Sequence, residues 1–251
     1  MSCHTSGGGS IWTNLHRALS AGVDLFLPPA CLLCGQRLPP GFDPQEFCPE
    51  CQAIMPPLGR SHCRCCSHPF PASSLQHLCA TCLQRPPAFS IVHAACSYQE
   101  RVKDAIHQLK YHNQVNLAQP LGKLLGKALE SAEVSFKPDC IIPVPLHSSR
   151  LRERGYNQAL EICRPLSRTL RVPIDSRFLL RTLKTPPQQG LTAAERKNNL
   201  RNAFMLTQKI SARKVLLVDD VMTTGETVRE CCRILLQGDV EEIQVAVIGR
   251  A

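Results

Sequence analysis

Aromatic residues are scarce in this chain of 251 residues, at 5% of the composition. So low a content argues against an extended surface that stacks nucleic-acid bases. The chain also lacks any run of 18 apolar residues, which excludes a transmembrane helix. Residues 1–30 lack a basic start followed by a continuous apolar stretch, so no secretory signal is visible. We therefore expect a cytoplasmic protein, and leave open whether it lies against the inner face of the membrane.

Positive charge is concentrated in one part of the chain. The formal net charge is +9, and residues 147–201 hold twelve Lys or Arg against four Asp or Glu. Such a stretch indicates an anionic partner, which can be a pyrophosphate, a nucleic acid or both. The alternative is a solvated basic face that binds nothing.

Cysteine, by contrast, is abundant: eight of 15 form four CxxC pairs separated by 13, 11 and 12 residues. A CxxC turn directs both thiols at one tetrahedral centre, so two pairs make a four-thiolate zinc site. We predict two structural zinc ions. Sequential pairing is the simplest arrangement, and a crossed pairing stays open. The predicted ligands are Cys31, Cys34, Cys48, Cys51, Cys63, Cys66, Cys79 and Cys82.

Disulfide bonding and redox activity account for these cysteines less well than zinc does. A disulfide framework needs an oxidising compartment, which the missing secretory signal disfavours. Redox-active CxxC pairs usually belong to a βαβ unit, and the sequence around these pairs shows none. A segment this short and poor in apolar residues needs metal to fold, and a structural zinc supplies about 10–16 kcal/mol in small zinc peptides.

A second pattern, VLLVDDVMTTGET, runs from Val215 to Thr227. Its apolar start predicts a short buried strand, and apolar residues at helical spacing after Gly225 predict a helix. In the turn between them, free backbone N–H groups and the helix dipole favour a phosphate. The two acids just upstream can accept hydrogen bonds from neighbouring sugar hydroxyls. The pattern predicts a ribose 5-phosphate site; the alternative is an ordinary strand–loop–helix junction whose acids cap the helix.

This pattern resembles the phosphoribosyl pyrophosphate (PRPP) motif of type I phosphoribosyltransferases. The resemblance implies that Asp219 and Asp220 bind the ribose hydroxyls. It also implies that the turn binds the 5-phosphate, through Thr223, Thr224, Gly225 and Thr227. In the general architecture of PRPP enzymes, a loop after an early strand wraps the pyrophosphate. The segment from Leu146 and His147 to Gly155 is placed to do so, with Arg150 and Arg154 as cationic clamps.

Strands and helices are expected to alternate after the cysteine pairs. An amphipathic helix is predicted at 11–26, and Pro/Gln/Gly-rich residues 185–192 are typical of a mobile lid or of a stiff surface loop. Strands are predicted at about 91–98, 139–144, 178–183, 214–219 and 243–248, and helices at about 100–111, 117–132, 150–171, 192–201 and 225–237. This order favours an α/β fold with a parallel sheet flanked by helices and a site at the strand C-termini. The predicted division is 1–30, a lead-in; 31–88, a double zinc ribbon; and 89–251, the α/β domain.

Over nearly its whole length the chain resembles the ComF/GntX family of phosphoribosyltransferase-like proteins. The resemblance is carried by LFLPPACLLCG, the cysteine pairs, SYQERVKDAIHQLKYH, IPVPLHSSRLRERGYNQA and VLLVDDVMTTGET. It implies a type I phosphoribosyltransferase fold that binds PRPP with Mg²⁺, and an association with DNA uptake and the use of imported DNA. Single-stranded DNA and DNA-uptake proteins are the partners it implies. Tyr98, Lys110 and Tyr111 fall in a segment expected to help form a hood over the acceptor.

Three functions follow from these features. The first is transfer of a phosphoribosyl group, in which Mg²⁺ and arginine neutralise the leaving pyrophosphate. The second is PRPP binding without catalysis in DNA uptake. The third is a zinc-ribbon adaptor for single-stranded DNA or a DNA-translocation partner. Many purine enzymes carry an acid directly before the T-G of the motif, where this chain has Thr223, so purine salvage is disfavoured. No residue is nominated as general base.

Overall fold

A computed structural model describes residues 29–71, 76–132, 136–183 and 202–251. The helices predicted at 11–26 and 192–201, and the lid predicted at 185–192, lie outside these residues. Within the described residues, no helix combines the length and apolar character needed to cross a bilayer.

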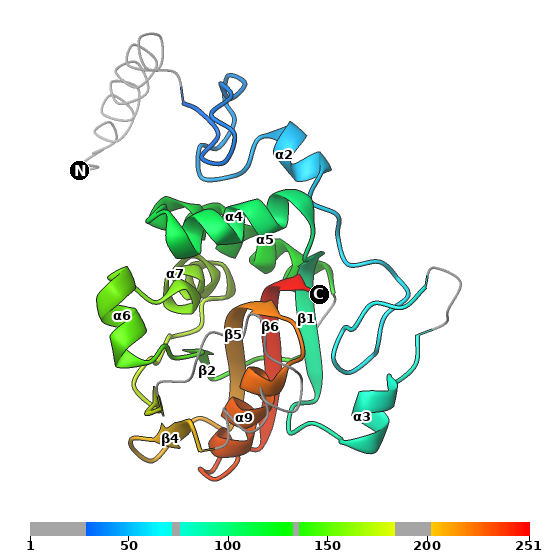
Figure 1. Cartoon of the computed structure of the whole chain (residues 1–251), viewed down its shortest axis with the longest axis vertical. Coiled ribbons are helices and arrows are strands. Elements are labelled where there is room, and N and C mark those ends of the chain that lie inside the picture. The colour runs from blue at the N-terminus through cyan, green and yellow to red at the C-terminus, as the bar shows by residue number, and fades with distance from the viewer. Residues whose placement is uncertain (1–28, 72–75, 133–135, 184–201) are drawn as a thin grey trace, which may run out of the picture.

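A four-stranded parallel sheet lies at the centre of the larger domain (Figure 1). The strand order is β1-β6-β5-β2. The strands are β1 (Ile91–Ser97), β2 (Cys140–Pro143), β5 (Lys214–Met222) and β6 (Glu242–Arg250). A parallel sheet covered on both faces favours continuous apolar strands, which accounts for the VLLV run in β5. The predicted parallel sheet flanked by helices is confirmed.

Helices cover both faces of the sheet (Figure 1). The face packed with α4, α5 and α7 buries Leu216 and Val218 of β5, whereas the face packed with α9 buries Val215 and Leu217. This alternation is the two-residue period of a strand. The helices are α4 (Glu100–Tyr111), a 3₁₀ turn η1 (Val115–Leu117), α5 (Ala118–Ser131), α7 (Gln158–Leu170) and α9 (Glu226–Leu235).

The single helix predicted over 150–171 is wrong. This segment forms two helices, α6 (Ser148–Arg154) and α7. Gly155 ends α6 in the left-handed conformation, with φ of +81°. Asn157 then caps α7, because its Oδ1 accepts from the Ala159 N–H at 3.0 Å.

The strand predicted at 178–183 does not join the parallel sheet. Instead, β3 (Leu179–Arg181) pairs antiparallel with β4 (Phe204–Leu206), a strand that was not predicted. Leu179 and Phe204 are buried, whereas Leu180 is 46% exposed and Met205 is 47% exposed. This alternation suits a half-exposed antiparallel ribbon and not a strand buried on both faces.

The cysteine-rich module covers the free edge of β1. It contains two short helices, α2 (Pro49–Ala53) and α3 (Ala80–Gln84). The backbone N–H of Ser97 donates to the Pro56 oxygen at 3.0 Å, and that of Val92 donates to the Cys65 oxygen at 2.8 Å. An exposed edge strand offers unpaired backbone groups to other chains, and these contacts close that edge.

The close packing of α5 on α7 depends on Gly122. A Cβ there would lie 2.3 Å from Cγ of Pro165 and 2.6 Å from the backbone oxygen of Ile162. We expect Gly122→Ala to lower the free energy of unfolding by about 1–3 kcal/mol in a urea titration, because the backbone of α7 must shift. Gly59→Ala, where no atom lies within 4 Å of the new Cβ, is the control. Equal midpoints for the two variants would contradict this packing.

Candidate functional site

Two adjacent carboxylates, Asp219 and Asp220, lie near the carboxyl end of β5. The end of β2 lies beside them, since the Val144 N–H donates to the Val218 oxygen at 2.8 Å. Neighbouring strand residues point to opposite faces. The Asp220 side chain accordingly meets α4, and the charge of Arg181, on β3, reaches Asp219. Both acids therefore lie at the edge of the sheet where α/β folds place their ligands.

Asp220 forms an ion pair with Lys110, the penultimate residue of α4. Nζ of Lys110 lies 2.7 Å from Oδ1 of Asp220, and Asp220 is only 6% exposed. Burial alone would lower the pKa of Lys110, but the Asp220 carboxylate outweighs it and raises that pKa. Sequence reasoning placed Lys110 in a hood segment and assigned it no partner. Its pairing depends on how α4 packs, which no local pattern shows.

Asp219 is held by the backbone of its neighbour, because its Oδ1 accepts from the Asp220 N–H at 2.9 Å. Burial raises the pKa of Asp219 to about 7, and the negative charge of Asp220 shifts it in the same direction. The positive charges of Lys110 and Arg181 oppose this shift. Asp219 is therefore a carboxylate whose charge is disfavoured until a ligand donates hydrogen bonds to it.

The predicted phosphate turn connects β5 to α9. Gly225 adopts φ of +79°, a left-handed conformation that favours glycine, and α9 begins at the next residue. Thr223 is exposed, and Thr224 and Thr227 are half-buried. The backbone of the turn is anchored by Arg250, whose Nη1 donates to the Met222 oxygen at 2.9 Å and to the Thr223 oxygen at 2.6 Å. Backbone N–H groups and threonine hydroxyls thus gather at one helix N-terminus.

The segment expected to wrap a pyrophosphate as a loop is a helix over most of its length. His147 caps α6, since its Nδ1 accepts from the Ser149 N–H at 3.2 Å. Leu146, just upstream, is half-buried, as are Arg150 and Arg154. The Arg154 guanidinium lies over the Tyr111 ring, 5.3 Å from its centroid. Asn157 fixes the following turn to the end of β2 by donating to the Val144 oxygen at 3.0 Å.

The eight cysteines of the CxxC pairs gather in two groups of four, in the sequential pairing. Within each group all sulfurs lie within 4.8 Å of one another. Distances between sulfurs include 3.6 Å for Cys34–Cys48, 3.9 Å for Cys31–Cys51 and 3.6 Å for Cys66–Cys79. A zinc ion with Zn–S bonds of about 2.3 Å separates its ligands by about 3.8 Å in a tetrahedron. In both groups the cysteine sulfurs are therefore already spaced as zinc ligands are.

Several backbone N–H groups point at these sulfurs. The N–H of Cys51 lies 3.4 Å from Sγ of Cys48, and the N–H of Cys79 lies 3.3 Å from Sγ of Cys63. Burial raises the pKa of Cys31 and Cys63, but such donors outweigh it and lower the pKa of each thiol to about 7. Thiolate is the form that binds metal. Burial raises the pKa of Cys48, Cys51, Cys66 and Cys82, so one acidic thiol in each group stands beside less acidic ones. The geometry of both groups is what suits structural zinc.

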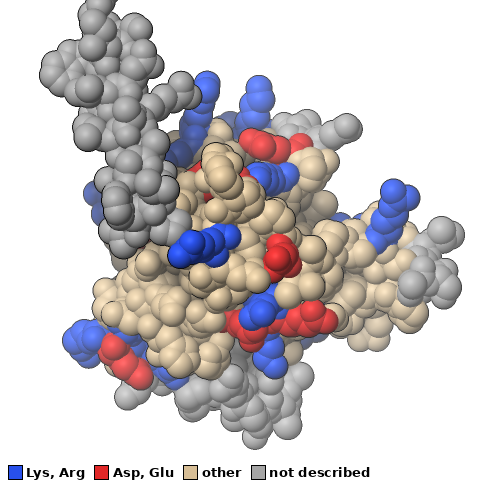
Figure 2. Space-filling view, turned by 90° about the horizontal axis from the view of Figure 1, so that it is seen from above, with Lys and Arg blue, Asp and Glu red and all other residues tan. Residues whose placement is uncertain are grey.

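In the described part of the basic stretch, residues 147–183, two arginines form ion pairs with neighbouring acids. Arg164 pairs with Glu161 at 2.9 Å, and Arg177 pairs with Asp175 at 3.2 Å. Figure 2 shows lysine and arginine side chains dispersed over the upper face, with acidic side chains among them. These paired arginines match the alternative of a solvated basic face.

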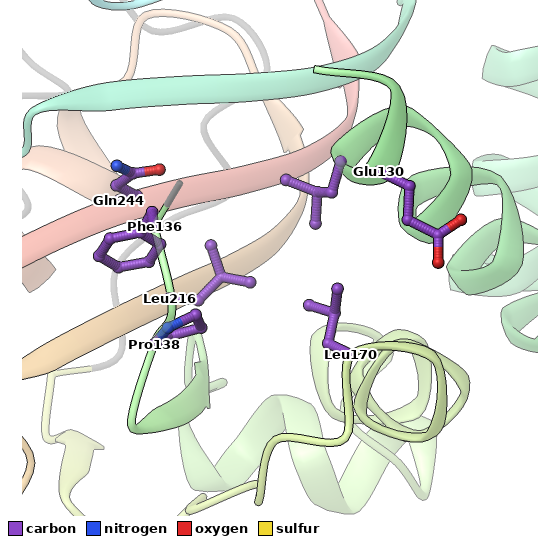
Figure 3. Close-up of a pocket in the computed structure, with 7 residues that line it drawn as sticks. Glu130, Phe136, Pro138, Leu170, Leu216 and Gln244 are labelled. Atoms are coloured by element: carbon purple, nitrogen blue, oxygen red, sulfur yellow. The ribbon is translucent and has the colours of Figure 1, made fainter. Parts of the chain in front are cut away.

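A separate apolar hollow of about 260 Å³ lies at the other end of the sheet (Figure 3). Leu216 and Gln244, near the starts of β5 and β6, line it together with Phe136, Pro138 and Leu170. The carboxylates lie near the opposite end of β5, so this hollow is not part of the same site.

Comparison with known proteins agrees with both parts of this description. A double zinc ribbon domain matches residues 22–83, and a phosphoribosyl transferase domain matches residues 107–250. A DNA utilization protein YhgH from Shigella flexneri is 36% identical over 90% of this chain and 99% of its own length. Competence protein F from Haemophilus influenzae is 38% identical over 70% of this chain and 79% of its own length. Competence protein ComFC from Streptococcus pneumoniae is 21% identical over 88% of this chain and 99% of its own length.

The two matched domains account for the two cysteine groups and for the parallel sheet with its acidic pair. The resemblance to the ComF/GntX family is thereby confirmed, and the chain belongs to the family in which a double zinc ribbon precedes a phosphoribosyltransferase domain.

Proposed function

We propose that the chain binds PRPP at the carboxyl edge of its sheet, as a cytoplasmic protein. The observation that carries this proposal is the acidic pair of β5 followed at once by the phosphate turn that Arg250 anchors. In this arrangement Asp219 and Asp220 accept from the ribose hydroxyls. The N–H and hydroxyl groups of residues 223–227 bind the 5-phosphate.

The same site can support transfer of the phosphoribosyl group to an acceptor. Arg150 and Arg154 are the cations assigned to the pyrophosphate, and Lys110 holds the Asp220 side chain in place through their ion pair. Carboxylate and phosphate oxygens are the donors that Mg²⁺ prefers, so Mg²⁺ delivered with PRPP fits this edge and would neutralise the leaving pyrophosphate. The chain's own contribution is to position the ribose and to surround its charges. The acceptor and a general base are left unassigned.

A second candidate function is that of an adaptor for single-stranded DNA. The names of the relatives, DNA utilization and competence proteins, support it. So does a small stacking surface beside the site: Tyr111 is 53% exposed, and the rings of Tyr111 and His107 are 4.8 Å apart. Arg154 adds a cation at this surface, of the kind that stacks with bases.

Asp219→Asn tests the ribose-phosphate site without a change of side-chain volume. We expect the variant to bind PRPP with Mg²⁺ at least about tenfold more weakly than wild type in calorimetry, a loss of about 1.4 kcal/mol. Asp239→Asn, at an exposed ion pair with Lys209, is the control and should bind normally. Normal affinity in Asp219→Asn, or no binding by the zinc-loaded wild type, would contradict the proposal.

The raised pKa of Asp219 predicts how the same substitution changes stability. Since folding raises this pKa, the ionised carboxylate opposes folding increasingly from pH 4 to pH 7 and fully above it. Asp219→Asn removes this opposition. Its melting temperature should exceed that of wild type at pH 8, by about 2–4 °C for each kcal/mol gained in the free energy of unfolding. This difference in melting temperature should shrink toward pH 5. A difference that grows on acidification would refute this assignment.

Tyr111→Ala tests the stacking surface of the second candidate function. If Tyr111 stacks a base, we expect single-stranded DNA affinity to fall about fivefold or more, because one stacked base contributes about 1–3 kcal/mol. Tyr111→Phe keeps the stacking face and should bind DNA as wild type does. Fluorescence anisotropy with a labelled oligonucleotide measures both. Equal DNA affinity in wild type and Tyr111→Ala would rule out a stacking role for this surface.

A further inference from the structure

The two cysteine groups have different surroundings. The first group (Cys31, Cys34, Cys48 and Cys51) belongs to the core on the α4 and α5 face. The segment between its two cysteine pairs is held to α5 by exposed ion pairs, Lys123–Asp43 at 2.5 Å and Lys127–Glu46 at 2.7 Å. The second group (Cys63, Cys66, Cys79 and Cys82) belongs to the core on the other face, with α9 and the end of β5. The second group is thus on the side of the phosphate turn.

Arg250 connects the second cysteine group to the phosphate turn directly. This residue ends β6 and is 4% exposed. Its Nε donates to the Cys66 oxygen at 2.8 Å, and its Nη1 donates to the Met222 and Thr223 oxygens at 2.9 and 2.6 Å. One rigid guanidinium therefore fixes the distance between a metal-ligand backbone and the turn.

Arg229 and Arg85 form a second connection, to the first turn of α9. Nη1 of Arg229 donates to the Arg85 oxygen at 2.8 Å, and its Nη2 lies 3.6 Å from Sγ of Cys82. The Arg85 side chain pairs in turn with Glu226, the first residue of α9, at 3.2 Å. The start of α9 is thus held to the segment that follows the last ligand.

Charge gives a reason for bound metal to strengthen these contacts. Four thiolates around Zn²⁺ carry a net charge of −2, and a buried guanidinium needs a compensating negative charge. Nη2 of Arg250 lies 4.0 Å from Sγ of Cys66, and Arg229 approaches Cys82 in the same way. Within the described residues, Nε of Arg229 is buried without a hydrogen-bond partner. Arg250 also donates to the Ala251 oxygen. A zinc–thiolate centre would add negative charge beside both guanidinium groups.

We propose that zinc in the second site positions the phosphate turn through Arg250 and Arg229, whereas zinc in the first site does not. The identity of the bound phosphate rests on the function proposed above, but the coupling of metal to turn does not. Arg250 and Arg229 are positioning residues, since they act on the turn and on α9.

The test compares Cys82→Ser with Cys51→Ser in the full chain. Both substitutions remove the last ligand of a group, so each should lower bound zinc from two ions to one by elemental analysis. In Cys82→Ser we expect amide hydrogen exchange of residues 222–230 to become at least about tenfold faster. In Cys51→Ser the exchange of these residues should match wild type. Equal exchange of 222–230 in both variants would overturn the proposal.

Arg250→Lys tests the same coupling with every ligand present, in case Cys82→Ser does not fold. Lysine keeps the charge but lacks the fork that reaches both Cys66 and the turn. We expect two bound zinc ions, faster exchange at 222–225 and PRPP affinity lowered about tenfold. Two zinc ions with wild-type exchange would refute the proposal. If wild type fails to bind PRPP, the function proposed above fails, and the exchange data still decide this inference.

Discussion

The placement of two adjacent carboxylates at the end of a buried strand constrains much of the structure. An unpaired carboxylate in such surroundings is costly, so the fold must bring cations to it. Lys110 reaches Asp220 from α4, which requires that helix to pack across the end of the sheet. The charge of Arg181 reaches Asp219 from β3, outside the parallel sheet. Two elements far apart in the sequence, each also packed on the core by its apolar residues, therefore bring a cation to the end of β5.

The cysteine-rich module is integrated with this edge and is not a separate appendage. Its backbone closes the free edge of β1, and its second metal group contacts the helix that follows the phosphate turn. The arginine that anchors this turn also donates to a ligand residue of the second metal group. The proposed ribose-phosphate site and the zinc ribbon are therefore connected by one side chain that contacts both. This arrangement gives a structural reason for the two domains to occur in one chain.

Local patterns predicted the features that local chemistry determines. The spacing of the CxxC pairs gave the two metal groups, and the VLLV run followed by two acids gave β5 as a strand of the parallel sheet. Features set by packing were not predictable in this way. Lys110 and Asp220 are 110 residues apart, and Arg250 and Cys66 are 184 residues apart. The break at Gly155 was missed because one helix was predicted to run through it, although Ser148–Arg154 has a single apolar residue, Leu151, and the buried face begins only in α7.

The central claim is that the end of β5 and the start of α9 bind a ribose phosphate. A crystal structure of the zinc-loaded protein with PRPP and Mg²⁺ tests it most directly. The account predicts ribose hydroxyl oxygens within about 3.2 Å of the carboxylates of Asp219 and Asp220, and the 5-phosphate on the N–H groups of residues 223–227. PRPP bound elsewhere, for instance in the apolar hollow beside Leu216, would contradict it.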